Sequence, residues 1–107
     1  MTTNYIQIVT TFATRADADS VGGELVRRRL AACAQVGGPI TSTYHWNGAV
    51  ETGDEWTLTI KTRGDRWEAV RAAIRELHPY ETPEILCLQA IAGDEKYLRW
   101  IDESLDG

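Results

Sequence analysis

The chain has 107 residues, the size of one ordinary domain, so we expect a single domain over residues 1–107. With 43% hydrophobic and 25% charged residues it can bury a core, unlike a disordered segment. The net charge of −5 argues against nucleic-acid binding, because an acidic surface repels phosphate backbones. No apolar run reaches the roughly 20 residues of a membrane span, and residues 1–5 lack the features of a signal peptide. We therefore expect a cytoplasmic protein that binds neither nucleic acid nor membrane.

The chain begins with a predicted strand and helix. Apolar residues alternate with others over residues 6–12, which indicates a strand with one more apolar face. Thr14, followed three residues later by Asp17, is a capping-box variant that opens a helix. The helical spacing of apolar residues ends before Leu30.

A long hairpin follows. Its first strand starts at Ala32, is interrupted by Gly-Gly-Pro at 37–39 and resumes up to Trp46. Asn47-Gly48 predicts a type I′ turn, which needs positive φ at both central positions. With the returning strand, which we expect to bulge near Gly53, the hairpin is longer than a domain of this size needs for its own sheet.

The second half of the chain predicts helix, strand and helix. Asp65 and Glu68 are placed to cap a helix that Pro79 ends. Residues 84–91 are a near-continuous apolar run, which predicts a strand that is buried on both faces. Asp94 is placed to cap a short last helix.

This order, β-α-β-β-α-β with a terminal helix, predicts an α+β domain of the ferredoxin-like type. We expect the long hairpin and the apolar last strand to pack against another protein chain, and a second copy of this chain is the simplest partner. We therefore expect Tyr44, Trp46 and Trp56 to be buried between subunits. Cys33 and Cys87 lie in apolar stretches and are expected to be buried free thiols.

The sequence gives little support for catalysis, because it lacks a nucleophile elbow, a P-loop and zinc-ligand spacing. The most unusual segment runs over residues 77–84 and carries His78, Glu81 and Glu84 between two prolines. An imidazole with two carboxylates suits a divalent metal ion. Alternatively, His78 interacts with the carbonyl end of its helix while the prolines fix the entry to the last strand.

Five segments, taken in order, resemble the CutA divalent-cation tolerance proteins across essentially the whole chain. They are Arg28-Arg29-Leu30-Ala31-Ala32-Cys33, the hairpin segment 40–48, Ile60-Lys61-Thr62-Arg63, the segment 77–85 and Tyr97-Leu98-Arg99-Trp100-Ile101-Asp102. The resemblance implies a ferredoxin-like subunit in a tight homotrimer, similar in architecture to the PII signalling proteins, in which long hairpins join sheets between subunits. It also implies an association with tolerance of copper and other divalent cations.

Two departures from the family pattern stand out. Ala34-Gln35 replaces the usual Val-Asn, and the strand over 6–12 has no cysteine to act as a thiolate ligand. Local chemistry and the resemblance together predict a weak site for Cu²⁺, Zn²⁺ or Ni²⁺, formed by His78 with Glu81 or Glu84 at a subunit boundary. The expected function is that of a non-enzymatic binding or signalling trimer.

Two other functions stay open at this point. One is a small hydrolase of the acylphosphatase kind, which shares the topology and has an arginine near the position of Arg15. The other is a nucleotide-sensing trimer that needs no metal.

Overall fold

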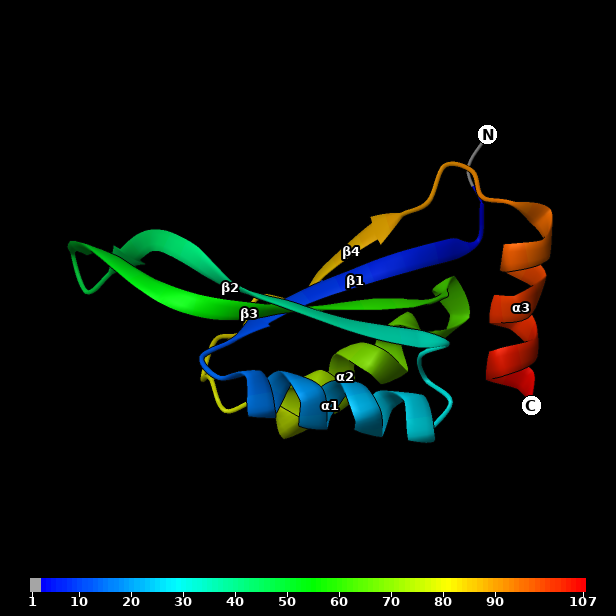
Figure 1. The fold of residues 1–107 in the computed structure, drawn as a ribbon, viewed down its shortest axis with the longest axis horizontal. Helices are drawn as coiled ribbons and strands as arrows, with labels where there is room; N and C mark the ends of the chain where they lie inside the picture. Colours follow the sequence, from blue (N-terminus) through cyan, green and yellow to red (C-terminus); the bar gives the residue numbers. More distant parts are fainter. Residues whose placement is uncertain (1–2) are drawn as a thin grey trace.

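Four antiparallel strands form one sheet in the order β2-β3-β1-β4 (Figure 1). A computed structural model describes residues 3–107. The expectation about a signal peptide rests partly on residues 1 and 2, which lie outside the described residues. The strands are β1 (Tyr5–Phe12), β2 (Cys33–Trp46), β3 (Ala49–Arg63) and β4 (Leu86–Gln89). The helices are α1 (Arg15–Arg27), α2 (Trp67–Leu77), which follows a 3₁₀ turn (Gly64–Arg66), and α3 (Glu95–Asp106). The predicted α+β, ferredoxin-like fold is confirmed.

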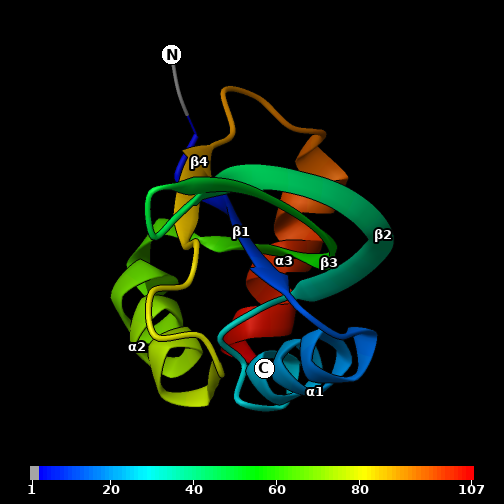
Figure 2. The same ribbon diagram turned by 90° about the vertical axis from the view of Figure 1, so that its left-hand side faces the viewer.

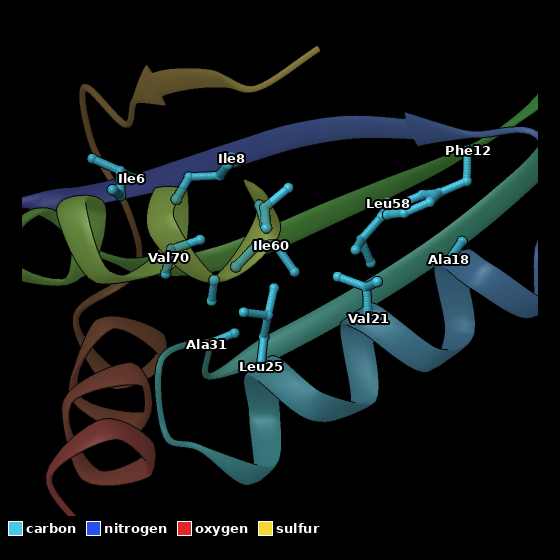
Figure 3. Packing of buried hydrophobic residues seen from close by; sticks show 12 residues of the cluster. Ile6, Ile8, Phe12, Ala18, Val21, Leu25, Ala31, Leu58, Ile60 and Val70 are labelled. Carbon is cyan, nitrogen blue, oxygen red and sulfur yellow. The ribbon is translucent and has the colours of Figure 1, made fainter. Parts of the chain in front are cut away.

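Helices α1 and α2 cover one face of the sheet, while α3 stands at its end (Figures 1 and 2). Ile8, Leu58 and Ile60 point from the strands into the core, where Leu25 and Val70 meet them from the two helices (Figure 3). All five are fully buried. Burying an aliphatic side chain of this size contributes about 1.5–3 kcal/mol each, so this layer is the main source of the monomer's stability.

Local signals in the sequence placed several element boundaries correctly. The Thr14 hydroxyl accepts a hydrogen bond from the Asp17 backbone N–H at 3.2 Å, and α1 ends at Arg27. The Asp94 carboxylate caps α3 by accepting from two backbone N–H groups of its first turn. Asn47 and Gly48 have φ values of 50° and 80°, as the predicted type I′ turn requires.

Two predicted details are wrong. The irregularity of the hairpin lies between Gly37 and Ile40, whereas Gly53 pairs regularly with Ser42. The start of α2 has no side-chain cap, because the Asp65 carboxylate binds Arg63 instead.

The last strand also differs from the expectation. It is only four residues long and its side chains are exposed, because β4 is an edge strand that pairs with β1 alone. Cys87 is therefore exposed and Cys33 half-buried, so the prediction of two buried thiols is wrong for the single chain. Within residues 3–107, no helix is both long and apolar enough to cross a membrane.

Candidate functional site: the open sheet face and the His78 loop

The face of the sheet opposite α1 and α2 is open and partly apolar. Side chains alternate between faces along a strand, so Val9 points away from the buried Ile8. Val9 pairs with Leu86, and Gln7 pairs with Leu88. Paired residues share a face of the sheet, so both leucines lie on this second face. They are 58% and 51% exposed.

The hairpin continues this face. Along β3, Glu55 and Glu51 lie on the same side as Thr57, opposite the side of the buried Leu58. Ile40 pairs with Glu55 and Tyr44 with Glu51, so these apolar side chains extend the same face, and Trp46 follows at the tip. We call this surface the open face; its large exposed hydrophobic residues are Leu86, Leu88, Ile40, Tyr44 and Trp46.

Helix α3 closes one end of the open face through an ionic anchor on β3. The Arg63 guanidinium donates to the carboxylates of Asp65, Asp102 and Asp106 at 2.9–3.0 Å. These hydrogen bonds raise the pKa of Arg63 and lower the pKa values of the three aspartates. The Tyr5 hydroxyl also donates to Asp102, at 2.7 Å. The sequence did not predict this anchor, although the i, i+4 spacing of Asp102 and Asp106 is a signal for it.

His78 lies at the other end of the sheet, between β1 and the loop that follows α2. Its ring is stacked on Phe12, with centroids 4.1 Å apart and planes within 12°, and only 7% of the residue is exposed. Nε2 lies 2.8 Å from the Thr11 carbonyl oxygen, and Nδ1 accepts from the Tyr80 backbone N–H at 3.1 Å. These partners require a neutral ring with its proton on Nε2. Burial is the main cause that lowers the pKa of His78.

The loop reaches the hairpin through Tyr80. Its hydroxyl donates to the Glu55 carboxylate at 3.0 Å, and its ring packs beside His78 with centroids 4.7 Å apart. Burial, together with the hydrogen bond to Glu55, raises the pKa of Tyr80 to about 12, so the phenol stays protonated at neutral pH. The sequence pattern indicated this loop but gave no sign that Glu55 is its partner.

The structure does not bring the predicted metal ligands together in one chain. Glu81 and Glu84 are exposed, while both ring nitrogens of His78 already have hydrogen-bond partners. Across residues 3–107, no group of three or more His, Cys, Asp or Glu side chains is arranged to hold a metal ion. A site with these three ligands would need a rearrangement of His78 and groups from a second copy, and it stays a prediction.

The structure does not show the other interpretation of His78, an interaction of its side chain with the carbonyl end of its helix. Its backbone N–H does cap α2 by donating to the Ile74 carbonyl at 2.8 Å, but its ring binds the carbonyl of Thr11 in β1 rather than the helix end. Arg15, the residue behind the hydrolase alternative, is more than half exposed and lies 3.7 Å from the Asp19 carboxylate.

Comparisons with known proteins agree on one family. Residues 6–104 match the family model described as CutA1 divalent ion tolerance protein. The divalent-cation tolerance protein CutA of Yersinia pestis is 35% identical over 102 residues, which cover 95% of this chain and 86% of that protein. The crystal structure of CutA from Xylella fastidiosa matches with a TM-score of 0.94 at 35% identity, over 97% of this chain and 100% of that one.

A second solved structure also matches. The periplasmic divalent cation tolerance protein CutA from Archaeoglobus fulgidus superimposes with a TM-score of 0.91 at 31% identity, over 94% of this chain and 98% of that one. Sequence and fold thus agree over nearly the whole length, and the chain belongs to the CutA1 divalent ion tolerance family.

Proposed function

We propose that this protein acts as a homotrimer in divalent-cation tolerance, as a binding or signalling module rather than an enzyme. The observation that carries the proposal is the open face, because a monomer would leave this apolar surface in water. Among the described residues, ten large hydrophobic side chains are exposed, and five of them belong to the open face. Exposed apolar surface of this extent is typical of a protein–protein interface.

A further copy of the chain is the partner that fits best. The sheet has two unpaired edges, β2 and β4, and β2 extends into the projecting hairpin. Such edges are complementary to each other and invite pairing between copies. An obligate interface of this kind buries on the order of 2,000 Å² or more, so the trimer should be the stable folded species.

Sedimentation tests the assembly. The wild-type protein should run at about three times its 12.0-kDa chain mass at micromolar concentration. Leu88→Asp places a charge on the open face and should give smaller species with intact secondary structure, because a charge is costly to bury in an interface. Ala69→Asp, on the exposed side of α2, is the matched control and should stay trimeric. A folded wild-type monomer at these concentrations would refute the trimer.

For the cation, we propose weak binding of Cu²⁺, with Zn²⁺ and Ni²⁺ as alternatives, by Glu81 and Glu84 with His78 or groups of a second copy. The two carboxylates are exposed on a loop that adjoins the hairpin, and the net charge of −5 favours the approach of a cation. One chain offers too few free ligands, so the affinity should be modest.

Calorimetric titration with Cu²⁺ tests this site. The double variant Glu81→Gln/Glu84→Gln keeps the size of both side chains and should lose the binding heat, whereas His45→Gln, on the exposed hairpin, should retain it. Equal binding by wild type and the double variant would exclude the two carboxylates. The cytoplasmic location also remains a prediction, which cell fractionation can check.

A further inference from the structure

The outer half of the hairpin has no support from the rest of the sheet. β1 ends at Phe12, which pairs with Trp56, so the part of β3 before Trp56 pairs with β2 alone. Residues 40–55 therefore form a two-stranded ribbon that projects from the body (Figure 1). Isolated two-stranded ribbons are marginally stable and twist more strongly than larger sheets. The direction of this ribbon must consequently be set by contacts at its root.

The root of the ribbon is held on each strand by a different contact. On β2, Gly38 has a φ of 142° and lies so close to Trp56 that an added Cβ would meet its ring at 2.9 Å. On β3, Glu55 is the first residue beyond the partner of Phe12, and its carboxylate accepts the hydrogen bond of the Tyr80 hydroxyl.

Tyr80 is itself fixed to the body of the domain. Its backbone N–H donates to Nδ1 of His78, and Nε2 of His78 donates to the Thr11 carbonyl at the end of β1. Because His78 is 7% exposed and stacked on Phe12, this end of the connection belongs to the core. The ribbon root is thus connected to the core by a short series of hydrogen bonds, from Thr11 through His78 and Tyr80 to Glu55.

We propose that the hydrogen bond between Tyr80 and Glu55 fixes the direction in which the hairpin leaves the sheet, and that this direction controls assembly. Glu55 pairs with Ile40, the first hydrophobic residue of the hairpin part of the open face. A change of angle at Glu55 therefore displaces the apolar side chains further out, Tyr44 and Trp46, relative to Leu86 and Leu88 on the body. The consequence for assembly rests on the trimer proposed above.

Tyr80→Phe is the test variant, because it removes the hydroxyl and leaves the ring beside His78. Tyr5→Phe is the matched control, since it removes another tyrosine–carboxylate hydrogen bond, to Asp102, at the opposite end of the sheet. Glu55→Gln should lie between wild type and Tyr80→Phe, because the amide oxygen still accepts from the phenol but carries no charge. Glu55→Ala should behave like Tyr80→Phe.

Two measurements on each variant distinguish a local effect from general destabilisation. Amide hydrogen exchange should become roughly tenfold faster over residues 41–54 in Tyr80→Phe and stay unchanged over 57–62, as expected for the loss of one hydrogen bond to a charged group. Each trimer loses three such hydrogen bonds, so sedimentation at a series of concentrations should show the trimer dissociating at roughly thirtyfold higher protein concentration than for wild type. Tyr5→Phe should change neither measurement.

Three outcomes would overturn the inference. The first is hairpin exchange in Tyr80→Phe equal to wild type, and the second is an equal effect of Tyr5→Phe on the hairpin. The third is faster exchange in the hairpin with unchanged trimer dissociation, which would refute the link to assembly. A wild-type protein that sediments as a monomer would instead refute the proposed trimer, and the exchange data would still decide whether Tyr80 fixes the hairpin.

Discussion

Titration of His78 should make the protein less stable as the pH falls below about 6.5, the ordinary histidine pKa of the unfolded chain. Burial lowers the pKa of His78 in the folded state, so below pH 6.5 the unfolded chain binds more protons than the native one. The stability that depends on the neutral ring is therefore fully present above pH 6.5 and is lost as the pH falls from there towards the folded-state pKa. A proton on Nδ1 would also face the Tyr80 N–H, donor against donor.

The expected slope is up to about 1.4 kcal/mol of unfolding free energy per pH unit, the value for one proton taken up on unfolding. The aspartates bound to Arg63 contribute in a different range. Their pKa values are lowered in the folded state, so their contribution is lost only as the pH falls through the ordinary aspartate value of about 3.9 and below. Between about pH 5 and 6.5 the slope should thus report mainly His78.

Urea unfolding at one fixed protein concentration, from about pH 5 to 7.5, measures this slope. His78→Gln should be less stable than wild type at pH 7.5 by about 2–3 kcal/mol, because it loses the stacking on Phe12 and at least one buried hydrogen bond. Its stability should no longer fall between pH 6.5 and 5. His45→Gln, an exposed position, should keep the wild-type slope. Equal slopes for wild type and His78→Gln would refute the reasoning.

Two further substitutions test other parts of the structure. Arg63→Ala should loosen α3 and lower the urea midpoint of unfolding more than Arg99→Ala, because the Arg63 side chain is 14% exposed and binds three carboxylates. Exposed i, i+4 pairs such as Arg99–Glu95 contribute within about 0.5 kcal/mol to stability. Equal midpoints for the two variants would contradict the role of Arg63 as an anchor. Gly38→Ala should lower the free energy of unfolding by more than about 1 kcal/mol, since the φ of Gly38 is positive and the added Cβ would meet Trp56. Gly37→Ala should lower it less, because a Cβ added at Gly37 meets open space. Thermal unfolding of both glycine variants shows whether this order holds.

The sequence by itself determined the elements that depend on neighbouring residues. The alternation over residues 6–12, the caps at Thr14 and Asp94 and the turn at Asn47-Gly48 all appear in the structure. Each of these signals acts over a few residues, through a hydrogen bond or a backbone preference that the local sequence fixes. The family resemblance, carried by motifs spread over the chain, was also readable without coordinates and agrees with the family match over residues 6–104.

Only the tertiary structure decided the features that join distant residues. The local sequence allows Asp65 to cap α2, but in the structure its carboxylate binds Arg63. Arg63 also binds Asp102 and Asp106, about 40 positions further along the chain. In the same way, Nε2 of His78 is not free to bind a metal ion, because it already pairs with the Thr11 carbonyl, 67 positions away.

Strand burial is decided at the same level. The apolar run over residues 84–91 favours a strand buried on both faces, yet the sheet order makes β4 an edge whose side chains face water in the single chain. A local sequence sets the propensity to form a strand, but its neighbours and cover come from the rest of the chain and from other copies, since packing depends on residues that are far apart in sequence.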